Sequence, residues 1–275
     1  MSRLTRSLSS EWRKVRSTKL WWVLAIVLAA YSAMMAATFA FLFGAMADSL
    51  GGVALPAQDA ADMVYSSVTT FGYVIPLLLG ALMATGEIRH RTLGLTFTLE
   101  PRRGVVLLSK SLVLLVCGIV LGVAGLIGAL AAGAPTLAGT GGEAMLGSAD
   151  TWALFARAVI AMSVWAIIGF GIGLLVGNQA FAIVIALVFT QFLEPVLRTG
   201  AQFWEWSAQI AKFLPGSATD AFVGASVMNS ISTLDPSLPD AAGPLGIWAG
   251  LLVLAAYAVA AVLAGWALRW RRDVV

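Results

Sequence analysis

Long uncharged stretches dominate the pattern of hydrophobic and polar positions along this chain. Four of them are long enough for one membrane-spanning helix of about 20 residues each, and they cover residues 20–47, 63–86, 111–142 and 241–268. A fifth stretch, residues 158–193, is too long for one crossing of a hydrocarbon core of about 30 Å, and Gly177-Asn178-Gln179 interrupts it. The pattern predicts an all-α integral membrane protein with six transmembrane helices, at about residues 20–46, 64–86, 106–132, 153–176, 180–197 and 246–268.

Composition excludes a soluble globular protein. Hydrophobic residues make up 60% of the 275 residues, charged residues only 11%, and the mean hydropathy is +0.90. Soluble domains carry about 25% charged residues. The apolar stretch that begins at Leu20 is too long for a cleavable signal, so we expect a permanent anchor and one transmembrane domain over residues 1–275.

The distribution of charge predicts the orientation. If both termini face the same side, that side receives fourteen of the 17 basic residues, and the other side keeps only Arg157, Arg198 and Lys212. The positive-inside rule then places both termini in the cytoplasm. Because the basic residues flank predicted helices, we interpret them as topological and expect anionic lipid headgroups, not nucleic acid, to face them.

Two segments outside the spans have patterns of their own. Residues 2–17 place Leu4, Leu8, Trp12 and Val15 on one helical stripe among basic residues, which predicts an amphipathic interfacial helix; the alternative is a basic leader that only sets topology. Residues 198–245 mix aromatic and polar residues around Pro215-Gly216. This pattern predicts an extracytoplasmic re-entrant helical hairpin before the last span, or alternatively a folded external loop with interfacial aromatics.

Other polar segments and small residues suggest no chemistry. Residues 48–62 and 133–150 are rich in Gly, Ala, Asp and Pro, which is typical of connectors. Glycines recur at helical spacing in the third and fourth spans, which favours plain helix packing; they are Gly118, Gly122, Gly125, Gly128, Gly169, Gly173 and Gly177.

The loop of residues 87–105 is the most informative segment. It combines clustered charges with the apolar residues Leu93, Phe97 and Leu99. Apolar side chains that fill a groove, flanked by charges that give register, are what a docking helix for a soluble partner needs. The alternative is a basic loop that only sets topology.

Several short motifs carry a resemblance to a known family. They are Gly86-Glu87 at the end of the second span, Arg91-Thr92-Leu93 after it, Glu100-Pro101-Arg102-Arg103 followed by Ser109-Lys110, which opens the third span, the N-terminal run from Glu11 to Thr18, and Leu214-Pro215. With these motifs the chain resembles the permease subunits of bacterial type-2 ABC exporters, which include drug and bacteriocin-immunity transporters. The resemblance covers nearly the whole chain in layout.

The resemblance implies a coupling helix and partners. Its coupling element, which contacts the ATPase, would consist of Glu87, Arg89, Arg91, Thr92, Leu93, Glu100, Pro101, Arg102 and Arg103. Gly177-Asn178-Gln179 would be a second, minor contact. The resemblance further implies two copies of an ABC-type ATPase, a second permease copy in a homodimer or related heterodimer, and a location in the bacterial plasma membrane.

The sequence offers no catalytic machinery. It lacks the G-x-x-x-x-G-K-[ST] phosphate-binding loop, so ATP and Mg are expected on the partner ATPase and no cofactor on this chain. His90 is the only histidine, which leaves no metal site or Ser-His arrangement. Cys117 is the only cysteine, so no internal disulfide exists.

Glu194 is the ionisable residue with the best claim to a role in the substrate path. Gln191 precedes it by three residues and Arg198 follows it by four. The spacing favours a Glu194–Arg198 salt bridge at a helix end, whereas the functional alternative is contact between a passing substrate and Gln191 and Glu194.

We therefore expect the permease subunit of an ATP-driven exporter for a hydrophobic or amphipathic substrate, such as a drug, an antimicrobial peptide or a lipid-like molecule. Alternatives are a secondary transporter, which would need mid-membrane acids or histidines, an intramembrane enzyme, which would need a cluster of catalytic residues, and a non-transporting sensor or scaffold subunit.

Overall fold

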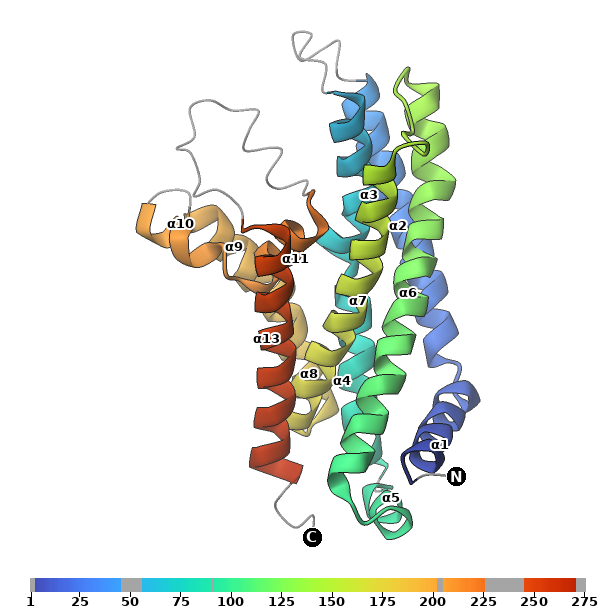
Figure 1. Ribbon diagram of the computed structural model, residues 1–275, viewed down its shortest axis with the longest axis vertical. Helices are drawn as coiled ribbons and strands as arrows, with labels where there is room; N and C mark the ends of the chain where they lie inside the picture. Colours follow the sequence, from blue (N-terminus) through green and yellow to red (C-terminus); the bar gives the residue numbers. More distant parts are fainter. Residues whose placement is uncertain (1–2, 46–55, 91, 202–204, 226–244, 271–275) are drawn as a thin grey trace.

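The computed structural model describes residues 3–45, 56–90, 92–201, 205–225 and 245–270. Within these residues the protein is helical and contains no strand. Figure 1 shows the helices, which are α1 (Arg3–Ser17), α2 (Leu20–Ala45), α3 (Ala57–Gly72), α4 (Val74–Arg89), α5 (Leu93–Leu99), α6 (Arg103–Gly139), α7 (Ala149–Val176), α8 (Gln179–Val188), α9 (Glu194–Gly200), α10 (Glu205–Ala211), α11 (Pro215–Val223) and α13 (Ile247–Gly265), with the π-helical turns η1 (Phe189–Leu193) and η3 (Trp266–Trp270).

Among the residues that the structure describes, six helical segments are long and apolar enough to cross a membrane, which confirms the predicted number. They are Leu20–Phe43, Ala57–Arg89, Arg103–Gly139, Ala149–Val176, Gln179–Gly200 and Ile247–Leu268. The third runs seven residues past the predicted end at 132, through Pro135. A Cβ at Gly133 would lie 2.8 Å from Val64 Cγ1 and 3.1 Å from Ala36 Cβ, so packing against α2 and α3 holds this turn helical despite the proline.

The second and fifth spans are interrupted along their length, and each of these interruptions lies near a proline. In the second span α3 ends at Gly72 and α4 begins at Val74, and Pro76 has no N–H to bond back to the carbonyl of Gly72. In the fifth span the π-helical turn η1 precedes Pro195. Such turns inside α-helices are frequent at functional sites.

Glycines let the central helices approach closely, as their spacing predicts. A Cβ at Gly80 of α4 would collide with the carbonyl oxygen of Ala166 in α7, and one at Gly169 of α7 with the carbonyl oxygen of Leu77 in α4. Gly118 of α6 faces the Cα of Ser163 in the same way. Gly177 has a different role, because it ends α7 with a φ of 62°.

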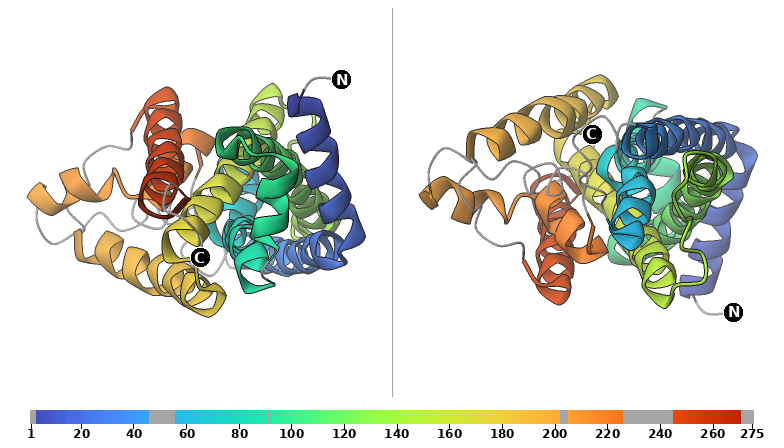
Figure 2. Two further views of the ribbon diagram at one scale, coloured as in Figure 1. Left: turned by 90° about the horizontal axis from the view of Figure 1, so that it is seen from below. Right: turned by 90° about the horizontal axis from the view of Figure 1, so that it is seen from above.

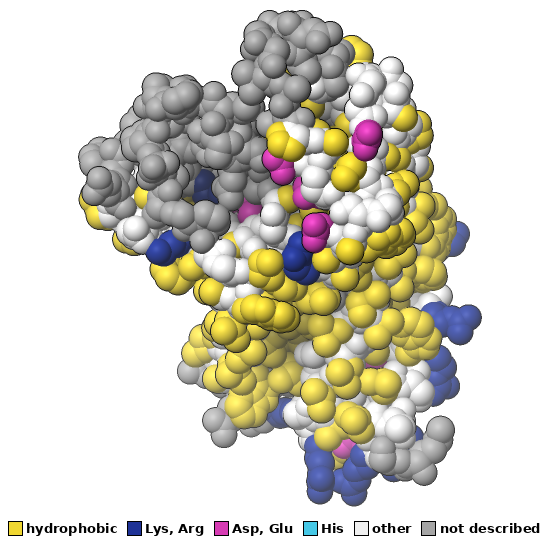
Figure 3. Space-filling model, turned by 45° about the horizontal axis from the view of Figure 1, so that its top comes forward, with side chains coloured by type: hydrophobic (Ala, Val, Ile, Leu, Met, Phe, Trp, Pro, Cys, Tyr) yellow, Lys and Arg dark blue, Asp and Glu magenta, His cyan; other side chains and the backbone are white. Residues whose placement is uncertain are grey.

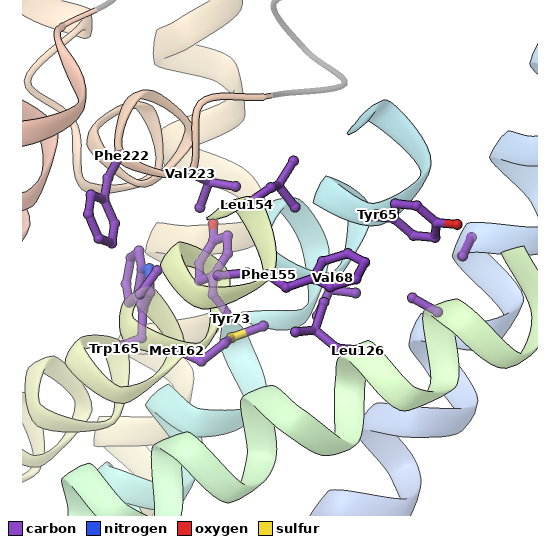
Figure 4. Close-up of a cluster of buried hydrophobic side chains, with 14 of the residues drawn as sticks. Tyr65, Val68, Tyr73, Leu126, Leu154, Phe155, Met162, Trp165, Phe222 and Val223 are labelled. Atoms are coloured by element: carbon purple, nitrogen blue, oxygen red, sulfur yellow. The ribbon is translucent and has the colours of Figure 1, made fainter. Parts of the chain in front are cut away.

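Helix α7 occupies the middle of the bundle. It contacts α4, α6 and α13, and Figures 1 and 2 place α8, α9, α10 and α13 on one side of it and α1, α2 and α6 on the other. Figure 4 shows the buried side chains around it, where Tyr73, between α3 and α4, meets Trp165 of α7 and Phe222 of α11. The rings of Tyr73 and Trp165 stack with centroids 4.3 Å apart.

The segments predicted outside the spans are also helical. Helix α1 covers the predicted residues 2–17 except Ser2, which lies outside the described residues. Burial varies along its predicted apolar stripe, since Val15 is buried while Leu4 and Trp12 are exposed. Within 198–245, the short helices α10 and α11 are separated before Pro215, and residues 226–244 lie outside the described residues. The interfacial and re-entrant placements remain predictions.

The surface is divided along the long axis of the bundle. Figure 3 shows a hydrophobic belt across the middle, Lys and Arg side chains gathered mainly at the end that holds α1 and α5, and acidic side chains nearer the opposite end. We call the basic end, which holds α1 and α5, the α5 end, and the opposite end the α11 end.

Candidate functional site

Four charged side chains form a closed ion cluster at the α5 end. Lys14 of α1 lies 2.6 Å from Glu11 Oε1 and 2.7 Å from Glu87 Oε1. Lys110 of α6 lies 2.7 Å from Glu11 Oε2 and 2.7 Å from Glu87 Oε1. Since Glu87 belongs to α4, the cluster ties α1, α4 and α6 together.

The cluster is largely buried, so its charges depend on one another. The side chains of Glu11 and Lys110 are each 3% exposed, and that of Glu87 is 12% exposed. Two carboxylates and two ammonium groups alternate, which leaves no net charge. Removing one partner would leave a buried charge uncompensated, which typically costs about 3–5 kcal/mol.

Lys14 is the half-exposed member of this cluster and links it to α5. Burial lowers the pKa of Lys14, but hydrogen bonds and charge from Glu11 and Glu87 outweigh it and raise the pKa above its usual value. Lys14 therefore stays protonated at physiological pH. Its Nζ also donates to Thr96 Oγ1 at 3.4 Å, which connects α5, in the predicted coupling segment (residues 87–105), to the buried cluster.

The predicted coupling residues lie in two different environments, one largely buried and one exposed. Glu87 points into the ion cluster, whereas Arg89, Thr92, Pro101 and Arg102 are exposed. Around them, Glu100 Oε1 accepts a hydrogen bond from the backbone N–H of Arg102 at 3.3 Å, and the Arg103 guanidinium lies 5.1 Å from the ring centroid of Phe97. Arg91 and the side chain of Leu93 lie outside the described residues.

The two segments predicted to contact the ATPase, the coupling segment and Gly177-Asn178-Gln179, lie side by side. Arg89 Nη1 at the end of α4 donates to Gln179 Oε1 at the start of α8, at 2.9 Å. Asn178 caps α8 by accepting from the backbone N–H of Ala180 at 3.0 Å. Gly177-Asn178-Gln179 and the coupling segment thus form one surface.

Sequence reasoning missed the pairing of Glu11 with Lys110. Both residues belong to quoted motifs, but neither was expected to be buried. A signal existed, because Glu11 is the only acidic residue before Asp48 in a strongly basic segment and Lys110 begins a long uncharged stretch. Two opposite charges at unfavourable places are a reason to look for a pair.

A second polar group lies at the α11 end and corrects the expected Glu194 pairing. Glu194 is 1% exposed, and its Oε1 accepts a hydrogen bond from the backbone N–H of Gly216, in the first turn of α11. Arg198 instead forms its salt bridge with Asp220 of α11. Helix α11 offers Glu194 free N–H groups and a favourable dipole, while Arg198 reaches a carboxylate one turn further along it. Gln191 is exposed.

Aromatic side chains extend this polar group into the bundle. The Tyr73 hydroxyl donates to the carbonyl oxygen of Thr190 in η1 at 3.1 Å, and Trp165 Nε1 donates to Thr219 Oγ1 at 2.9 Å. The interrupted spans and α11 are thereby joined at one level. In the described residues no three His, Cys, Asp or Glu side chains are grouped closely enough to hold a metal ion.

Comparison with known families identifies the kind of protein. The sequence model of the ABC-2 family transporter protein matches residues 7–192, about two thirds of the chain. The chain belongs to the ABC-2 transporter family. This ABC-2 protein is therefore a multi-pass membrane subunit of an ABC transporter, and the family implies an ABC ATPase partner. No curated protein matches the chain.

The matched region includes the whole ion cluster of the ABC-2 protein. All four charged residues lie within 7–192, as do the coupling segment and the contact between Arg89 and Gln179. The match ends two residues before Glu194, so α11 and the last span lie beyond it.

A double-mutant cycle on Glu11 and Lys110 tests the ion cluster. Lys110→Met should lower the free energy of unfolding by about 3–5 kcal/mol, because it leaves the Glu11 carboxylate buried beside one cation. Adding Glu11→Gln should recover much of that loss. Chemical unfolding in mild detergent, followed by tryptophan fluorescence, measures both values.

Lys14→Met is the matched comparison and should lower the free energy of unfolding by less than Lys110→Met, since the Lys14 side chain is 41% exposed. Additive effects of Lys110→Met and Glu11→Gln would contradict the cluster.

Proposed function

We propose that this chain is the membrane-spanning permease subunit of an ATP-driven exporter whose ATP hydrolysis occurs on a separate ATPase subunit. The observation that carries the proposal is the buried ion cluster of Glu11, Lys14, Glu87 and Lys110, which lies directly behind the coupling segment. It supplies a rigid link from a surface for a soluble partner to the spans α4 and α6.

The proposed coupling step uses this link. ATP and Mg on the partner close the ATPase, the ATPase displaces α5, and the cluster carries the displacement into α1, α4 and α6. Separating these helices would leave buried charges exposed or without a partner, so the helices move together. The contact between Arg89 and Gln179 adds the start of α8 to the moving body.

The orientation and assembly follow the same proposal. The α5 end faces the cytoplasm with both termini, in agreement with the positive-inside rule, and the membrane is a bacterial plasma membrane. Two permease copies, identical or related, and two ATPase copies form the transporter. Exposed apolar side chains such as Phe192 and Trp248, 73% and 75% exposed, provide surfaces for lipid or for the second copy.

The cargo is proposed to be hydrophobic or amphipathic. The buried group of Glu194, Arg198 and Asp220 would then hold α11 closed over the inner part of the bundle at the extracytoplasmic end. Opening this end requires α11 to part from Glu194 and Arg198, which gives Glu194 a role in transport through the position of α11.

Co-purification with an ATPase tests the proposed function. Arg91→Glu combined with Leu93→Glu should release the nucleotide-binding subunit from detergent-solubilised membranes, because it reverses a charge and replaces an apolar side chain by an acidic one in the proposed coupling segment. ATP hydrolysis by the purified complex is the second readout. Lys212→Glu with Ile210→Glu makes similar changes at the α11 end, where Ile210 is 61% exposed, and should leave the complex intact.

If no ATPase accompanies the wild-type protein, the proposed function fails, and a secondary carrier or a scaffold subunit takes its place.

Substitution of Glu194 by glutamine tests the proposed role of the α11 end. The amide oxygen of the new side chain still accepts from the Gly216 N–H, so the amount of assembled protein should stay the same. ATP-dependent uptake of hydrophobic dyes into inverted vesicles should change at least several-fold, because the charge that attracts the α11 N-terminus is gone. Asp150→Asn, an exposed acid in the first turn of α7, should have no effect. Unchanged uptake in the Glu194→Gln protein would reject the role.

A further inference from the structure

An apolar pocket lies where α1 meets the membrane-spanning helices. It has a volume of about 100 Å³. Helix α1 contributes Trp12, Val15 and Arg16, and α2, α4 and α6 contribute the other lining residues, including Trp21 and Cys117. None of the residues discussed for coupling or for the α11 end lines it.

The pocket opens to the surface that faces lipid. Trp12 and Val120, which both line it, are 38% and 39% exposed. Val120 lies on α6, in one of the six membrane-spanning helices. An apolar group from the membrane can therefore enter without crossing water.

One charged side chain at the pocket defines what kind of apolar molecule fits. Arg16 is exposed and lines the pocket together with apolar side chains. An apolar molecule that carries an anionic group can therefore place this group at the Arg16 guanidinium.

The position along the bundle matches the interface of a lipid leaflet. Trp21 lies in the first turn of α2, whose membrane-spanning segment begins at Leu20, and tryptophan is enriched at this depth. Lipid headgroups carry their phosphate and ester oxygens there, and basic residues attract anionic lipids. Arg16 and the neighbouring exposed Lys19 provide that attraction.

We propose that this pocket binds one anionic phospholipid from the leaflet on the α1 side. Part of an acyl chain occupies the space among Val15, Cys117 and Val120, and Arg16 pairs with the phosphate. The lipid fills the space between α1 and the helices α2 and α6, so it stabilises the position of α1, which carries Glu11 and Lys14. This inference does not depend on the direction of transport or on its cargo.

Native mass spectrometry of protein released from nanodiscs tests the site. The nanodiscs contain phosphatidylglycerol and phosphatidylcholine in equal parts. The wild-type protein should retain phosphatidylglycerol in preference to phosphatidylcholine. Arg16→Gln should weaken the retention of phosphatidylglycerol about tenfold, whereas Arg6→Gln, on the same helix but away from the pocket, should not.

A second pair of variants tests the pocket itself without changing charge. Val120→Trp should block the mouth and abolish retention of either lipid. Val116→Trp is the matched control, since Val116 is 44% exposed on the same helix but does not line the pocket.

Three results would overturn the proposal. They are the absence of retained lipid in the wild-type protein, wild-type retention in the Val120→Trp protein, and equal retention of both lipids unaffected by Arg16→Gln, which would mean a pocket for any apolar chain.

Discussion

Buried charges in a membrane protein must compensate one another, and here that requirement organises the α5 end. Glu11, Lys14, Glu87 and Lys110 come from three helices far apart in sequence, yet each carboxylate touches both cations. None of the four can move far alone, because one buried charge left without a partner costs a large part of the net stability of a typical small domain. The N-terminal helix, the second span and the third span are therefore coupled by electrostatics.

Close packing transmits this constraint through the bundle. Gly80 and Gly169 bring the backbones of α4 and α7 together, and Gly118 does the same for α6 and α7. Helix α7 also contacts α13, and Trp165 of α7 bonds Thr219 of α11. A displacement at Glu87 thus has a continuous packed route to the helix that faces Glu194 and Arg198, without any long-range charge interaction.

The sequence predicted the spans well because length and absence of charge determine what crosses a membrane. It predicted the end of the third span less well, since Gly133 and Pro135 resemble a connector locally and only the contacts with Val64 and Ala36 keep that turn helical. Glu194 and Arg198 were expected to pair because their spacing allows it, but α11 offers both residues a better partner. That choice depends on tertiary contacts 22 residues away in sequence, which spacing along one helix does not contain.

The central claim is that the ion cluster fixes the coupling segment to the spans, and hydrogen–deuterium exchange tests it most directly. The amides of residues 3–17 and 93–99 would be followed in the wild-type protein and in Lys110→Met, with the middle of α7 as the internal reference. The account predicts that the substitution raises exchange in both segments by more than in the middle of α7, where exchange rises only with the lower global stability. Equal exchange of residues 93–99 in the two proteins would contradict it, because α5 would then be held independently of the buried charges.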